Sequence, residues 1–338
     1  KEATYYWSHM VADDLPHLLP VLTDMVTDSV ITDADVNVER SVIIDELAMG
    51  EDSPAEVAGE AFAQAVFGDS GLGRPVGGTR TSVEGMTPEK IRSLYRAKYA
   101  PCDLVVAAAG AVDHEGIAAL LADALQASPW SSQLRPGLHP QRRQPGGDLV
   151  APSGEEGRHR RIHRDVEQAH VLVGGPWLRA LDPSGPAAAV TLNLLGGGMS
   201  SRLFQEIREK RGLAYSTYAY SSAYSDTGFF SLYAGCSPKH VEEVEKVMWG
   251  EVEKLAETGP TEEEVTRSRG QIRGGVTLNL EDTGSRMARL ARAELVGELT
   301  PVADSLARID AVEAADVQEI ARRMLGAQRA SVVVGPHV

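Results

Sequence analysis

A stretch rich in proline, glutamine, arginine and glycine interrupts this chain of 338 residues between about residues 128 and 153. At its centre, residues 136–147 show no apolar period that would favour a helix or a strand. Such composition is typical of an extended linker between domains. Because 338 residues suffice for about two domains, we expect a first domain at residues 1–130, a linker at 131–156 and a second domain at 157–338.

A weak internal repeat suggests that the two domains share a fold. Residues 83–112 read as a helix followed by an apolar strand, and residues 309–338 read the same way. Any two helix–strand units share some periodicity, so chance similarity and true duplication both stay open. A true duplication predicts an α+β fold with two similar halves joined by the linker. In each half, helices would pack on a mixed or antiparallel sheet.

Apolar periodicity and turn residues place the expected elements along the chain. We expect strands at residues 3–10, 103–112, 158–173 and 330–334, and a hairpin formed by residues 213–222 and 228–235. We expect helices at residues 35–51, 186–195 and 200–211, and further long helices within 238–325. The sequence Ser53-Pro54-Ala55-Glu56 predicts a capping box that begins another helix.

Charge and cysteine content exclude several classes of function. The formal net charge of −15 argues against a nucleic-acid partner, because phosphate contacts require a basic face. No apolar run approaches the roughly 20 residues that span a bilayer, so no membrane partner is expected. The two cysteines, Cys102 and Cys236, lack the spacing of a disulfide framework or a cysteine zinc site. We expect two reduced, buried thiols in a cytoplasmic protein.

Two glutamates stand one heptad apart in the helix expected at residues 35–51. Glu39 and Glu46 are separated by nearly two helical turns and therefore project from one face, with Val42 and Ile43 between them. Carboxylates beside an apolar stripe are costly to bury unless a positive charge pairs with them. Zinc would supply that charge, since it accepts carboxylate oxygen as a ligand. A solvated helix face also explains the pair, so both interpretations stay open.

Two groups of motifs occur in an order that carries a family resemblance. The first comprises Glu39-Arg40 through Glu46, Asp52-Ser53-Pro54, Leu72-Gly73-Arg74-Pro75, Gly77-Gly78-Thr79 and Tyr99-Ala100-Pro101. The second comprises Leu195-Gly196-Gly197-Gly198-Met199-Ser200-Ser201-Arg202-Leu203-Phe204 and Arg211-Gly212-Leu213-Ala214-Tyr215. The series resembles the pitrilysin-type zinc metallopeptidases, or inverted zincins, and within them the bacterial branch similar to mitochondrial processing peptidases. The resemblance extends from about Ala3 to the C-terminus.

The resemblance implies roles for individual residues. Glu46, which closes the E-R-x-x-x-x-x-E pattern, matches the third zinc ligand of the family. Glu39, which opens the pattern, matches a nearby supporting glutamate with a catalytic role. Arg208 and Tyr215 match an arginine and a tyrosine, seven residues apart, that contact the substrate backbone. Both side chains can hydrogen-bond the scissile carbonyl as negative charge develops on its oxygen.

The resemblance also implies a reaction and a cofactor. One zinc ion activates a water molecule for peptide hydrolysis, and a glutamate accepts the proton. In the second domain, Gly197 and Gly198 form a turn that is expected to lie against the substrate. The parent protein is expected to be a zinc endopeptidase or oligopeptidase that acts on unfolded peptides in a chamber between its two halves. Its expected assembly is a homodimer, or a heterodimer with a related subunit.

The chain departs from the family at its most important motif. The H-x-x-E-H helix, which supplies two histidine ligands and the general base, is absent and is expected upstream of Lys1. The nearest histidine pair, His159 and His163, has Ile162 in place of the glutamate and is expected on a strand. The first half is therefore expected to be incomplete, and this chain by itself is expected to be inactive, as part of a larger enzyme. The alternative is a natively non-catalytic core or partner subunit of the same fold.

A simpler interpretation of the second motif group also stays open. Arg202, Arg208, Lys210 and Arg211 are concentrated toward the end of one expected helix. Basic residues in a last helical turn stabilise the negative end of the helix dipole without any role in binding.

Overall fold

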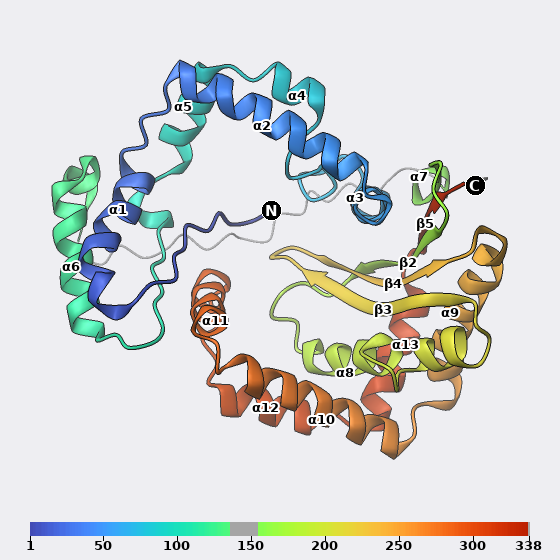
Figure 1. Cartoon of the computed structure of the whole chain (residues 1–338). Coiled ribbons are helices and arrows are strands. Elements are labelled where there is room, and N and C mark those ends of the chain that lie inside the picture. Colours follow the sequence, from blue (N-terminus) through green and yellow to red (C-terminus); the bar gives the residue numbers. More distant parts are fainter. Residues whose placement is uncertain (136–154, 337–338) are drawn as a thin grey trace. The chain divides into compact units, whose positions relative to one another are not determined.

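The computed structural model describes residues 1–135 and 155–336 and divides into two compact units. The first unit comprises Lys1–Glu46, Thr79–Arg143 and Thr277–Leu299, and the second comprises Leu47–Gly78, Gln144–Val276 and Thr300–Val338. Figure 1 shows the elements of both. Most of the linker predicted at residues 131–156 lies outside the described residues, so the predicted domain boundaries stay a prediction.

The second unit is built on a five-stranded mixed sheet. Its strands have the order β1-β5-β2-β4-β3, in which β1 pairs with β5 in parallel and every other pairing is antiparallel. The strands are β1 (His159–His163), β2 (Ala169–Trp177), β3 (Ala214–Ala223), β4 (Gly228–Cys236) and β5 (Ala330–Gly335). The sheet confirms the predicted α+β class, the predicted hairpin and the predicted strand near residue 330.

Helices cover both faces of this sheet because its inner strands are apolar on both sides. Three helices pack on one face, where Phe230 and Leu232 of β4 point: α8 (Gly185–Gly196), α9 (Val241–Thr258) and α13 (Ala314–Gly326). Helix α3 (Pro54–Phe67) packs on the other face through Phe62 and Phe67, whose rings meet Phe229 edge-on at 5.6 and 5.9 Å. Strand β4 is consequently buried along its whole length.

Shorter and peripheral elements complete the second unit. The short helix α7 (Glu155–Arg158) precedes β1, and a π-helical turn spans Phe204–Glu209 before β3. Helix α10 (Glu262–Asn279) follows α9, and its last three residues belong to the first unit. Helix α12 (Val302–Asp310) precedes α13.

The described residues of the first unit form helices and connecting segments, without a strand. Its helices are α1 (Leu15–Thr27), α2 (Asp33–Glu51), α4 (Arg80–Glu84), α5 (Pro88–Lys98), α6 (His114–Ala127) and α11 (Thr283–Val296), and the last turn of α2 belongs to the second unit. Side chains of α5 hold the segment between α1 and α2. Tyr95 Oη donates to the Val26 carbonyl at 2.8 Å, and Arg92 binds the Ile31 carbonyl and the Asp33 carboxylate at 3.0 and 2.9 Å.

Two strands and one cap predicted in the first 112 residues are wrong. Residues 3–10 and 103–112 form no ladder, because no neighbouring strand pairs with them within the described part of the chain. The helix half of the proposed repeat is present as α5, but its strand is not. Helix α3 begins at Pro54 as predicted, yet the Ser53 side chain makes no capping hydrogen bond. Cys236 is buried as predicted, whereas Cys102 is only half-buried.

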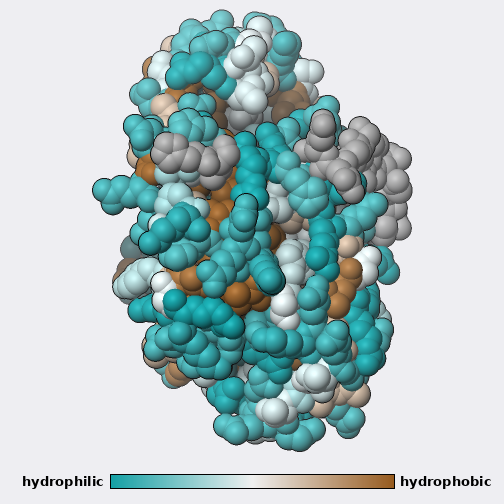
Figure 2. All heavy atoms as spheres, turned by 90° about the vertical axis from the view of Figure 1, so that its right-hand side faces the viewer, coloured by the Kyte–Doolittle hydropathy of each residue, from teal (hydrophilic) through white to brown (hydrophobic). Residues whose placement is uncertain are grey.

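The face drawn in Figure 2 is mostly hydrophilic, and its apolar residues are gathered in patches. Within residues 1–135 and 155–336, no helix combines the length and the hydropathy needed to cross a bilayer.

Candidate functional site

Arg208 and Tyr215 meet in the second unit, as the family resemblance predicts. Arg208 lies in the π-helical turn and Tyr215 in the first part of β3. Gly212 joins the two elements with φ of +61°, a left-handed conformation that glycine adopts without steric cost. Nη1 of Arg208 then donates a hydrogen bond to the Tyr215 carbonyl at 3.0 Å.

The helix predicted at residues 200–211 widens into a π-helical turn. The amide of Lys210 donates to the Gln205 carbonyl, five residues back, at 3.0 Å. Such turns are rare and often mark functional sites. Leu203 and Ile207, which are fully buried, anchor the turn to the core. Arg208, one position further on, is therefore directed away from the core face, and its side chain is 36% exposed.

Tyr215 occupies a β-bulge on the edge strand β3. Ala214 pairs with Cys236 and Ser216 pairs with Gly235, so Tyr215 has no partner residue on β4. A bulge re-aims a side chain and is common beside active sites. The Tyr215 side chain is correspondingly open, with 74% of the residue surface exposed.

The Arg208 guanidinium contacts two aromatic rings. Its central carbon is 4.5 Å from the centre of the Tyr215 ring and 4.8 Å from the centre of the Phe204 ring. Both distances lie within the range of cation–π attraction. Sequence reasoning does not single out Phe204, although its position four residues before Arg208 places it on the same side of the turn.

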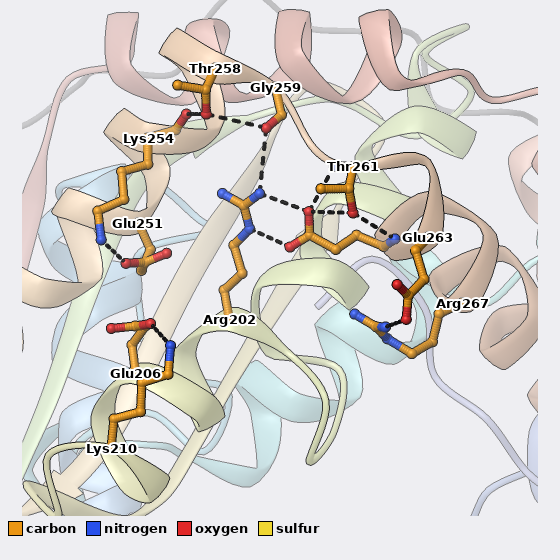
Figure 3. A network of polar contacts seen from close by, with 11 residues as sticks. Arg202, Glu206, Lys210, Glu251, Lys254, Thr258, Gly259, Thr261, Glu263 and Arg267 are labelled. Atoms are coloured by element: carbon orange, nitrogen blue, oxygen red, sulfur yellow. Dashed lines mark hydrogen bonds and ion pairs between the residues drawn. The ribbon is translucent and has the colours of Figure 1, made fainter.

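The other basic residues of this segment have acidic partners, and Figure 3 shows those of Arg202 and Lys210. Arg202 binds both carboxylate oxygens of Glu264, at 2.7 and 2.9 Å. Lys210 at 2.6 Å and Arg211 both bind Glu206, and these hydrogen bonds lower the pKa of Glu206 to about 2. Arg202, Lys210 and Arg211 are thus used within the fold. Arg208 has a long contact of 3.9 Å between its Nε and the exposed Glu209 carboxylate, and it combines partial exposure with an exposed tyrosine.

The glycine turn is held by two amide side chains. The Gln271 amide donates to the Gly197 carbonyl at 2.6 Å, and the Gln205 amide donates to the Met199 carbonyl at 2.8 Å. A side chain at Gly196 would overlap the Ala219 amide of β3, since its Cβ would lie only 2.2 Å away. Gly197 is exposed and Gly198 half-exposed. This turn therefore packs closely against β3 while its outer side stays accessible.

Glu39 and Glu46 both lie on α2 in the first unit, and both are exposed. The arginine of the E-R pattern has a structural role there. Arg40 donates to the Asn37 side chain at 2.6 Å and to the Met86 carbonyl at 2.7 Å, which ties α2 to the loop before α5.

The described residues do not complete a zinc site. A catalytic zinc ion takes three protein ligands. Among residues 1–135 and 155–336, no group of three or more histidine, cysteine, aspartate or glutamate side chains could hold a metal ion. His159 and His163 are exposed on strand β1, as expected. Within the described residues, Glu46 can therefore supply at most one of the ligands that a zinc ion needs.

Comparisons with known proteins agree with this arrangement. A family model described as the peptidase M16 inactive domain matches residues 85–272. An uncharacterized zinc protease of Streptomyces coelicolor is 44% identical over 337 residues, which cover 99% of this chain and 72% of that protein.

Two solved structures share the fold. A protease from Helicobacter pylori has a TM-score of 0.83 at 18% identity, over 96% of this chain and 77% of that one. A chain of Complex III2 from Candida albicans has a TM-score of 0.74 at 19% identity, over 96% of this chain and 78% of that one. The family model and the bacterial zinc protease confirm the resemblance to the pitrilysin-type peptidases, and this chain belongs to the peptidase M16 family.

Proposed function

We propose that this chain supplies the substrate-holding part of a zinc-dependent endopeptidase or oligopeptidase that cleaves unfolded peptides. The observation that carries the proposal is the Arg208–Tyr215 pair. A π-helical turn and a β-bulge, both uncommon, present one guanidinium and one open phenol side by side. The protease names of the relatives support the same reaction class.

In this proposal, Arg208 and Tyr215 bind the backbone of the peptide that is cleaved. Nη1 of Arg208 donates to the Tyr215 carbonyl, and its Nε lies 3.9 Å from a Glu209 carboxylate oxygen, so Nη2 is the nitrogen best placed to donate to a substrate carbonyl. The Tyr215 hydroxyl can donate to the same carbonyl oxygen. Both donors become more effective as negative charge develops on that oxygen, which lowers the barrier to cleavage.

The glycine turn fits a role beside the peptide backbone. Asn193 and Gln271 fill the space beside the two glycines where a side chain would lie, but Gly197 is exposed and Gly198 half-exposed, so their main chain stays open to a substrate on the other side. Two amide side chains fix the turn, so little order has to be gained when a peptide binds. We therefore propose that both glycines contact substrate.

Other parts of the proposal rest on the family resemblance. Glu46 is proposed as one zinc ligand and Glu39 as its supporting glutamate. Enclosure of the substrate in a chamber, a homodimer or a heterodimer with a related subunit, and a cytoplasmic location also stay predictions.

The decisive test compares variants of the complete translation product that contains this sequence. With zinc present, we expect cleavage of an unfolded casein-derived peptide mixture, followed by mass spectrometry. Glu46→Gln should lose both bound zinc and cleavage. Arg208→Lys and Tyr215→Phe should keep zinc, measured by atomic absorption, but lose at least about tenfold in kcat/KM, because each removes a transition-state donor. Cleavage at wild-type rates in both variants would refute the proposed roles.

A second candidate is a non-catalytic structural subunit of the same fold. Two observations favour it: the described residues lack a complete metal site, and the fold matches a chain of Complex III2 at a TM-score of 0.74. A structural subunit should show no cleavage in any variant. It should instead co-purify in a defined assembly that Glu46→Gln leaves intact.

A further inference from the structure

Phe204 is one of the two aromatic residues that contact the Arg208 guanidinium. The guanidinium carbon lies 4.8 Å from the Phe204 ring centre and 4.5 Å from the Tyr215 ring centre. Tyr215 is itself a proposed substrate contact on an exposed bulge, with 74% of its surface open to solvent. Phe204, by contrast, is half-buried in the π-helical turn. The Phe204 ring is therefore held more firmly by its surroundings than the Tyr215 ring.

We propose that Phe204 is a positioning residue that holds the Arg208 guanidinium in the orientation needed to bind the substrate carbonyl. This inference rests on the proposed function of Arg208. Phe204 acts through Arg208 and has no assigned contact with substrate.

The contacts around Arg208 fix its orientation in complementary ways. An arginine side chain has several rotatable bonds and, when partly exposed, loses rotamer entropy on ordering. The two rings limit where the guanidinium can lie, because a cation is attracted to the face of an aromatic ring. Independently of the rings, the Glu209 carboxylate lies 3.9 Å from Nε. The hydrogen bond from Nη1 to the Tyr215 carbonyl then limits the rotation of the guanidinium. The remaining donors are left in a defined direction.

The position of Phe204 is set by the core beneath it. Leu203 and Ile207 are fully buried and four residues apart, so they fix one face of the turn. Phe204 and Arg208 follow them by one residue each and therefore share the neighbouring face. The Gln205 amide, bound to the Met199 carbonyl at 2.8 Å, holds the same turn from its other end.

A spectroscopic experiment tests the contact independently of catalysis. In the ¹⁵N-labelled chain, the Nε–Hε resonance of Arg208, assigned by its loss in Arg208→Lys, should carry ring-current shifts. Phe204→Leu keeps an apolar side chain but removes the ring, so the resonance should move toward that of free arginine. Phe204→Tyr should leave it in place. Arg329, which lies 4.3 Å over the Trp249 ring, supplies a control resonance that should not move.

A kinetic experiment on the complete translation product tests the consequence. Phe204→Leu should lower kcat/KM for peptide cleavage about two- to fivefold, the effect expected for loss of one exposed cation–π contact. Phe204→Tyr should restore the rate. In the double variant with Arg208→Gln, which removes the cation, Phe204→Leu should cost nothing further, because both changes remove one coupled interaction. A purely structural phenylalanine would instead give additive losses.

The two experiments separate the possible failures. An Arg208 resonance that ignores Phe204→Leu overturns the positioning role, whatever the kinetics. A resonance that moves while kcat/KM does not change also overturns it, because Arg208 would then need no positioning. A wild-type protein without peptidase activity refutes the proposed function, and the resonance alone then decides whether Phe204 holds Arg208.

Discussion

Arg202 shows how one residue of a functional-looking motif serves the fold. It stands in the Gly-Gly-Gly-Met-Ser-Ser-Arg motif, yet its guanidinium donates hydrogen bonds to Glu264 at the start of α10. It also donates to the Gly259 carbonyl at 3.4 Å (Figure 3). Burial raises the pKa of Glu264, but hydrogen bonds from Arg202 and Thr261 outweigh burial and hold this pKa below its ordinary value. The ion pair therefore joins the glycine motif to the N-terminus of α10.

Removing Arg202 should destabilise the chain much more than removing a neighbouring surface arginine. Arg202→Met leaves Glu264, whose side chain is only 17% exposed, without its cation, at a cost of about 2 kcal/mol. Arg267→Met breaks an exposed pair with Glu263 and should cost less than about 0.5 kcal/mol. Urea unfolding followed by circular dichroism gives both values. Equal midpoints for the two variants would show that the Arg202 pair adds no stability.

At the scale of single elements, ion pairs of Glu206 with Lys210 and Arg211 stabilise the π-helical turn. Glu206 accepts from Lys210 and Arg211, and these contacts hold its pKa at about 2, well below the ordinary 4.5. A carboxyl group with a lowered folded-state pKa stabilises the native state only while it is ionised. This stabilisation is full above about pH 4.5 and disappears as the pH falls toward 2.

Glu206→Gln should therefore lower the melting temperature in a pH-dependent way. The difference from the unmodified chain should be largest at neutral pH and should shrink progressively between pH 4.5 and pH 2, as the native carboxylate takes up its proton. Glu257→Gln, an exposed carboxylate on α9, serves as a control and should show little difference at any pH. A melting-temperature difference for Glu206→Gln that stays constant across this range would show that the ionised Glu206 carboxylate does not stabilise the turn.

The sequence predicts regular elements of this site better than its irregular ones. The hairpin and α8 carry clear periodic signals, and their positions were predicted to within one or two residues. The bulge at Tyr215 depends on the register with β4, and the π-helical turn depends on how Leu203 and Ile207 fit the core. Both are decided by packing partners distant in sequence. Residues 103–112 have the composition of a strand but no partner within the described chain, so composition alone predicted them wrongly.

At the scale of the whole molecule, one face of the sheet is covered by a helix, α3, that lies far upstream in the sequence. Helix α3 belongs to the second unit and packs Phe62 and Phe67 on the face formed by Leu172, Val332 and Val334. The compact second unit therefore needs residues 47–78 as well as the segments that follow residue 144. Without α3, this apolar face of the sheet would meet water.

A fragment of residues 157–338 should consequently be much less stable than the full chain. Loss of the two buried phenylalanines and Val66 of α3 should cost roughly 5 kcal/mol, by the usual value of burying such side chains. The fragment should bind the dye ANS, and a synthetic peptide of residues 47–78 should suppress that binding. A fragment that unfolds at the same urea concentration as the full chain would contradict the packing of α3.

The place of β5 between β1 and β2 has a consequence for biosynthesis. A ribosome completes β1 and β2 long before it reaches residues 330–335, so the emerging polypeptide carries both strands without the one that joins them. Contacts this remote along a chain form slowly. During translation, the β2–β4–β3 meander can assemble early, while β1 lacks its partner β5 and its backbone hydrogen-bonding groups stay unpaired. A chaperone that binds unpaired strands would therefore act on β1 until β5 is made.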